Sequence, residues 1–146
     1  MKIKIKKLTE NARLPYRATE GSAGMDLYTV IDEPVLLEPH KNYAFPTGLA
    51  IELPSNDFVA LVYARSGLAT KCGIAPTNCV GVIDSDYRGE IIVNLMNHTN
   101  TTQKINPGDR IAQLIIAPVI IPEIEEVDKL SDTSRGTGGF GSTGKN

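Results

Sequence analysis

The apolar runs of this chain are short and are interrupted at close intervals, and this limits what it can fold into. Proline or glycine stands between most of the runs, and no long helical periodicity is present. The runs read as strands over residues 2–6, 35–37, 49–53, 58–63, 91–95 and 111–121. The best helix candidate is short: it begins near Ser66, a plausible N-cap, and continues through Leu68. We therefore expect an all-β, jelly-roll-like barrel with one short helix.

The length of 146 residues suits one core, which we expect over residues 1–127. Residues 128–146 form a flexible Gly-rich arm in this interpretation, because five of the last twelve residues are glycine. The arm resembles a P-loop from Gly139 to Lys145, but Asn146 stands where that motif needs Ser or Thr to bind magnesium. A flexible spacer is the plainer reading. Alternatively, Arg135 could bind phosphate and Phe140 could stack on a base.

Composition excludes several classes of protein. The formal net charge of −2 argues against a protein that coats nucleic acid polymers, and the apolar stretches are too short to be transmembrane helices. The first ten residues lack the apolar region of a signal peptide, so a cytoplasmic location is expected. Cys72 and Cys79 are then expected to be buried free thiols. The two histidines are too few for a histidine-rich metal site.

Two short segments could bind an anion. Asp26 lies among small residues in Ser22–Leu27, where it could cap a turn or serve a site. In Ala64–Ala69, an arginine, a hydroxyl and free amides at the expected helix start would suit phosphate. A surface turn between strand and helix fits the second segment about equally well.

The segment Asn78–Glu90 carries the most polar chemistry. Two glycines, Gly81 and Gly89, are expected to make tight turns between apolar strands. Asp84 and Asp86 would share a face of an extended chain, where paired carboxylates could hold a metal or activate water. They could equally form an ordinary hairpin loop. The neighbouring tyrosine is either a platform for a sugar or base, or a core residue.

A glutamine interrupts the apolar run that follows Pro107-Gly108. Strand alternation places Gln113 on the same face as Ile111 and Ile115, and opposite Arg110, Ala112 and Leu114. Such a glutamine needs hydrogen-bond partners if it is buried. It is either a satisfied core amide or a substrate contact.

Five stretches, taken together and in order, resemble the five motifs of the trimeric dUTP pyrophosphatases. They are SAGMDL, ARSGLA, GVIDSDYRG, GDRIAQLI and RGTGGFGSTG. The resemblance spans about Ser22 to Gly144. It implies hydrolysis of dUTP to dUMP and pyrophosphate, which keeps uracil out of DNA and supplies dUMP for thymidylate synthesis. It also implies Mg²⁺ held by the substrate phosphates and water rather than directly by the protein, and an arm that closes over bound nucleotide.

The resemblance assigns roles residue by residue. Asp84 matches the general base that activates water, while Asp26 and Arg110 support the phosphate site. The matching substrate-binding positions are Arg65, Ser66, Gly67, Asn78, Gly81, Val82, Tyr87, Gln113, Arg135, Phe140, Gly141 and Ser142. Among them, Asn78 would pair with the uracil edge, Tyr87 would exclude a 2′-hydroxyl, and Phe140 would stack on the uracil.

The resemblance further implies a homotrimer with three shared sites, in which motifs one, two and four come from one subunit, motif three from a second and motif five from a third. Two alternatives remain. A dCTP deaminase shares the fold, but Asn94 stands where that enzyme has its catalytic glutamate. The second alternative is a catalytically silent relative that only binds nucleotide or a protein.

Overall fold

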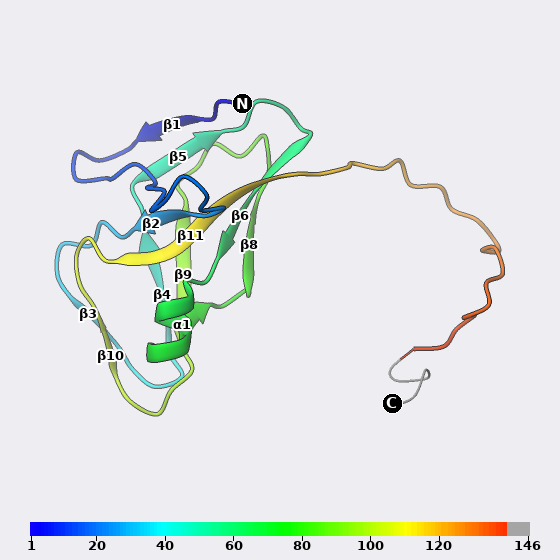
Figure 1. The fold of residues 1–146 in the computed structure, drawn as a ribbon. Helices are drawn as coiled ribbons and strands as arrows, with labels where there is room; N and C mark the ends of the chain where they lie inside the picture. Colours follow the sequence, from blue (N-terminus) through cyan, green and yellow to red (C-terminus); the bar gives the residue numbers. More distant parts are fainter. Residues whose placement is uncertain (140–146) are drawn as a thin grey trace.

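The computed structural model describes residues 1–139, which fold mainly into short strands around one core (Figure 1). The first six strands precede the helix α1 (Ser66–Cys72), and the other five follow it. The strands are β1 (Lys4–Lys7), β2 (Met25–Tyr28), β3 (Val35–Leu37), β4 (Asn42–Pro46), β5 (Leu49–Glu52), β6 (Phe58–Tyr63), β7 (Ile74–Pro76), β8 (Val80–Ile83), β9 (Ile92–Asn97), β10 (Gln103–Ile105) and β11 (Arg110–Pro118).

Within residues 1–139 the strands pair into four antiparallel sheets. The largest has the order β2-β11-β6-β8, and a second has the order β4-β9-β7. Two pairs, β1-β5 and β10-β3, complete the set. The predicted all-β, jelly-roll-like fold with one short helix is confirmed, although these sheets do not join into one closed barrel.

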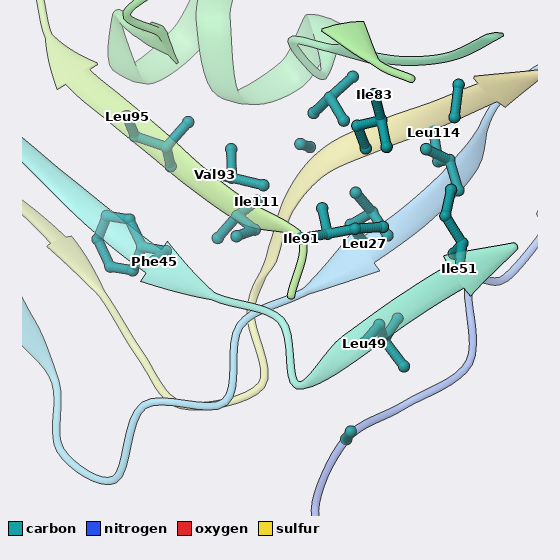
Figure 2. Packing of buried hydrophobic residues seen from close by; sticks show 14 of the residues in the cluster. Leu27, Phe45, Leu49, Ile51, Ile83, Ile91, Val93, Leu95, Ile111 and Leu114 are labelled. Atoms are coloured by element: carbon teal, nitrogen blue, oxygen red, sulfur yellow. The ribbon is translucent and has the colours of Figure 1, made fainter. Parts of the chain in front are cut away.

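Strands from all the larger sheets contribute to one buried core. Figure 2 shows how side chains of β2, β4, β5, β9 and β11 meet there. The fully buried side chains include Leu27, Phe45, Leu49, Leu95, Ile111 and Leu114. This core fixes the largest sheet, which carries most of the predicted site.

The last strand ends at Pro118 and not at Ile121 as predicted. Pro118 lies opposite Phe58, the first residue of β6, so the ladder ends where its partner strand begins. One further bond holds the chain, from the Val119 amide to the Asp57 carbonyl at 2.8 Å. The chain then runs away from the body (Figure 1), and Ile120 is 88% exposed.

Both cysteines are free thiols, as predicted, but neither is buried. Cys72 ends α1 and is partly buried. Cys79 is exposed at the turn between β7 and β8, where its φ of 62° is in the left-handed region. The predicted burial is therefore wrong for both: Cys79 lies in a surface turn, and Cys72 ends a helix that has no buried residue. No helix within residues 1–139 is long and apolar enough to cross a membrane.

Candidate active site

One row of the largest sheet brings three of the predicted segments together. Gln113 of β11 lies opposite Asp26 of β2 on one side and Tyr63 of β6 on the other. Since Arg65 and Ser66 follow Tyr63 by two and three residues, the start of α1 lies at the same end of the sheet. Strand register alone therefore gathers polar groups from three distant parts of the chain.

A hollow of about 390 Å³, here called the Arg65 pocket, opens at this point. It is lined by Tyr16, Ala18, Ser22, Ala23, Gly24, Asp26, Arg65, Ser66, Gly67, Arg110, Gln113 and Ile115. All six predicted residues of the first, second and fourth segments are in this lining.

Asp26 joins the two arginines of the Arg65 pocket. Arg65 Nε donates to Asp26 Oδ1 at 2.7 Å, and Arg110 Nη1 donates to Asp26 Oδ2 at 3.0 Å. The Asp26 side chain is only 13% exposed. A carboxylate between two guanidinium groups fixes both, and a net positive charge remains for an anion. Asp26 thus bonds to other side chains and does not cap its own turn.

Arg110 and Gln113 line the same pocket, so their predicted placement on opposite faces is wrong. The pairing of β11 with β2 shifts between Arg110 and Ala112, which marks a β-bulge. A bulge inserts one residue and reverses the alternation beyond it. Without it, Arg110 would point away from Asp26.

The backbone on either side of the pocket is shaped by close contacts. Arg65, and not Ser66, is the N-cap of α1: its φ of −83° and ψ of 131° are extended, and no side chain caps the helix. Gln113 Nε2 donates to the Ala64 carbonyl at 2.8 Å. A side chain at Gly24 would lie 3.1 Å from the Gln113 Cδ, so this glycine leaves the space that the amide fills.

Replacing Asp26 with asparagine is expected to lower the free energy of unfolding by about 1–3 kcal/mol, the scale of hydrogen bonds to charged groups. Two half-buried arginines would lose their shared carboxylate. The measurement is denaturant unfolding at one fixed protein concentration, since assembly affects apparent stability. Asp132→Asn is the matched control, because Asp132 also pairs with a cation, Lys129, but its side chain is 89% exposed. The control is expected to change the free energy by less than about 0.5 kcal/mol; equal effects would contradict a special role for Asp26.

The tight turn predicted at Gly81 is not present in the segment Asn78–Glu90. β7 pairs with β9, whereas β8 pairs with β6, so the turn at 77–79 is a corner between two sheets. Gly81 lies inside β8 opposite Val62 and is not in a turn. A side chain there would meet the Val62 Cβ at 3.1 Å and the Asn78 amide nitrogen at 3.6 Å. Glycine is therefore needed for close approach, which places the Asn78 side chain over the strand.

A second hollow of about 280 Å³, the Tyr87 pocket, lies beside β8. It is lined by Val62, Pro76, Asn78, Gly81, Val82, Ile83, Asp84, Tyr87, Glu90, Ile91, Ile92, Val93 and Asn94. All five predicted residues of the third segment are in this lining. Tyr87 is 46% exposed and so is not a core residue.

Asp84 and Asp86 do not share an extended strand. β8 ends at Ile83, and the Tyr87 amide donates to the Asp84 carbonyl at 3.2 Å, which closes a turn over residues 84–87. Asp84 lines the Tyr87 pocket, but Asp86 does not. Both carboxylates line a further hollow beside Phe58, and only that of Asp84 also lines the Tyr87 pocket.

The Arg65 pocket and the Tyr87 pocket share no lining residue. Arg135 lies in the exposed tail beyond both, where its Nε donates to the Gly138 carbonyl at 2.8 Å. Phe140, Gly141 and Ser142 lie outside the described residues. Within residues 1–139 of one chain, the predicted site residues are therefore divided among the Arg65 pocket, the Tyr87 pocket and the tail.

Several contributors were missed from sequence. Glu90 and Asn94 line the Tyr87 pocket, and Arg17 Nη1 donates to the Ser22 and Ala23 carbonyls beside the Arg65 pocket. For Glu90 a signal existed: it directly follows the third motif and precedes an apolar run. Nothing local marked Arg17, because its partners are backbone carbonyls.

The donor set of the two pockets fits an ion that arrives with phosphate. Among residues 1–139 no group of three or more His, Cys, Asp or Glu residues could hold a metal. The carboxylate of Asp26 is already shared by two arginines, whereas Asp84 is exposed and accessible. Hard cations such as Mg²⁺ keep several waters and bind through one or two carboxylates plus substrate phosphates.

Known proteins resemble this chain along nearly its whole length. A deoxyuridine 5′-triphosphate nucleotidohydrolase of Desulfitobacterium hafniense is 52% identical over 132 residues, covering 90% of this chain and 87% of its own. The corresponding protein of Nautilia profundicola is 50% identical over 145 residues, covering 99% and 100%.

Solved structures agree with this match. The dUTPase of Staphylococcus bacteriophage 80alpha with dUPNHPP has a TM-score of 0.88 and 30% identity, covering 98% of both chains. A variant dUTPase of phage phi11 of S. aureus, described with a structural Mg(II) ion, has a TM-score of 0.81 and 28% identity, covering 90% of this chain and 100% of that one. The sequence model of the dUTPase family matches residues 10–144, and the chain belongs to the dUTPase family.

Proposed function

We propose that this protein hydrolyses dUTP to dUMP and pyrophosphate, and thereby limits uracil in DNA and supplies dUMP for thymidylate synthesis. The observation that carries the proposal is the family match over residues 10–144, with relatives named deoxyuridine 5′-triphosphate nucleotidohydrolases at 50% identity and above. The two pockets supply the chemistry that this reaction needs.

The Arg65 pocket is proposed to bind the triphosphate. Its two guanidinium groups, the Ser66 hydroxyl, the backbone at Gly67 and the Gln113 amide are all anion-compatible groups. Asp26 holds both guanidinium groups in place through bonds of 2.7 and 3.0 Å. Fixed positive charge beside a transferring phosphoryl group is the main catalytic contribution expected in this reaction.

The Tyr87 pocket is proposed to bind deoxyuridine. The Asn78 side chain lies against the glycine of β8, where it offers a donor and an acceptor to the uracil edge. Gly81 and Val82 of β8 supply backbone groups along the same side. The Tyr87 ring packs against the sugar and leaves no space for a 2′-hydroxyl. Asp84, which lines this pocket, is the proposed base that takes a proton from the attacking water.

Mg²⁺ is the proposed cofactor, and it would be held by the substrate phosphates and water. When bound, it would neutralise charge on the phosphates. The protein's part is to present Arg65, Arg110 and Gln113 to those phosphates, and to keep the Asp84 carboxylate available to water.

A shared site in a homotrimer is part of the proposal. We propose a β domain within residues 1–127 and an arm over residues 128–146 that brings Arg135 to the triphosphate and Phe140 to the uracil, with Gly141 and Ser142 beside the phosphates. The separation of the Arg65 and Tyr87 pockets in one chain supports completion of each site by other subunits. We place the enzyme in the cytoplasm, where the free state of both cysteines is expected.

Substrate selectivity tests the proposal. With Mg²⁺ present, pyrophosphate release from dUTP is expected to exceed that from dCTP by a factor on the order of 10⁴, because cytosine leaves the polar groups of the pocket unpaired. UTP and dTTP should also be hydrolysed far more slowly. Comparable turnover of UTP would contradict the role of Tyr87, and ammonia release from dCTP would indicate a deaminase instead.

A further inference from the structure

We infer that Glu90 is a positioning residue, which fixes the Tyr87 ring and so sets the discrimination between deoxyribose and ribose. The inference rests on the role proposed above for Tyr87. It concerns a carboxylate that the dUTPase motif does not include.

The Tyr87 ring is held by its own chain. Its hydroxyl donates to the Glu90 carbonyl at 3.1 Å. Its Cζ would lie 2.6 Å from a side chain added at Gly89, so the ring rests directly on the backbone of this glycine. Because Tyr87 is 46% exposed, few other contacts limit its position. The position of the Tyr87 ring therefore depends on the position of the backbone at residues 89 and 90.

The Glu90 carboxylate anchors that backbone to a buried segment. Glu90 Oε1 accepts a hydrogen bond of 2.7 Å from the Gly48 amide. Gly48 lies between Thr47 and Leu49, whose exposed fractions are both 0%. A bond from an amide to a carboxylate is stronger than one between neutral groups. Glu90 thereby connects the loop under Tyr87 to the core.

Gly48, which the Glu90 carboxylate binds, is held in place by its surroundings. Gly48 has a φ of 67°, and a side chain there would meet the Ala12 Cβ at 2.8 Å, so its surroundings are closely packed. Next to it, the Ile91 amide donates to the Leu49 carbonyl at 2.8 Å. This backbone bond holds residue 91, and the side-chain bond of Glu90 extends the attachment to residue 90, whose carbonyl accepts the hydrogen bond from the Tyr87 hydroxyl.

The experiment compares kcat/KM for dUTP and for UTP in variants at positions 87 and 90. Glu90→Ala is expected to lower the dUTP-to-UTP ratio about fivefold, which corresponds to loss of the neutral hydrogen bond from the Tyr87 hydroxyl to the Glu90 carbonyl. Glu90→Gln keeps an oxygen that can accept from Gly48 and is expected to restore most of the ratio. Glu33→Ala is the matched control, because Glu33 is exposed and lines neither pocket.

The Tyr87→Phe background shows whether Glu90 acts through the tyrosine. This variant lacks the hydroxyl that reaches the Glu90 carbonyl and keeps only the ring contact with Gly89, so adding Glu90→Ala to it should lower the ratio less than Glu90→Ala does in the wild type. An unchanged ratio in Glu90→Ala, or an equal fall in both backgrounds, overturns the inference. If Glu90→Ala does not fold, Glu90→Asp, which is too short to reach Gly48, provides the same test. Failure of the wild type to prefer dUTP would instead overturn the proposed function.

Discussion

Replacing Asp84 with asparagine is expected to lower kcat for dUTP by about 10²–10⁴-fold, the usual contribution of a general base. Asparagine fills the same space but cannot accept a proton from water. Asp84 is exposed at the end of β8, so the substitution should cost little stability. The measurements are single-turnover pyrophosphate release and the affinity for an imido analogue of dUTP, which should stay within a few-fold of wild type.

Asp86→Asn is the matched control for this prediction. Asp86 lies in the same turn and has the same charge, but it does not line the Tyr87 pocket. Its kcat should remain within a few-fold of wild type. If both variants lose activity equally, the loss results from removing a negative charge from the turn and not from removing a base at Asp84. If neither does, the base lies elsewhere.

The sequence predicted the parts of the Arg65 pocket better than their arrangement. The strand that carries Gln113 was predicted from a short apolar run, whereas β2, which carries Asp26, was not among the predicted strands. Their pairing was not predicted either, because register depends on contacts between segments more than eighty residues apart in sequence. The same limit explains Arg110: a bulge cannot be read from alternation, and it alone moves this arginine beside Asp26.

The glycines of the third motif show a different limit. Glycine signals a turn when only the local chain is considered, yet Gly81 lies in a strand, where a side chain would crowd the opposite Val62 and contact the Asn78 amide. Gly89 likewise makes space for the Tyr87 ring. In both cases the reason for glycine is a neighbouring side chain, which only the folded structure reveals. Glu90 was missed on the same ground, since its partner at residue 48 is distant in sequence.

Mixed trimers are expected to recover activity from two inactive chains. One parent is Asp84→Asn, and the other is cut after Ser134 and so lacks Arg135 and Phe140. The cut should leave thermal stability nearly unchanged, because the described residues 122–139 hydrogen-bond only among themselves. Each parent should be nearly inactive alone, since one lacks the base and the other lacks the arm.

The expected recovery follows from the subunit arrangement. If a site takes the Tyr87 pocket from one subunit and the arm from another, it is complete when the first is a truncated chain and the second is an Asp84→Asn chain. Random assembly of equal amounts in a closed ring gives each condition a probability of one half, so about a quarter of the sites should be active. If base and arm came from the same chain, no mixture could contain a complete site. Native mass spectrometry must first confirm that mixed trimers form; absence of activity in confirmed mixtures would refute a site shared in this way.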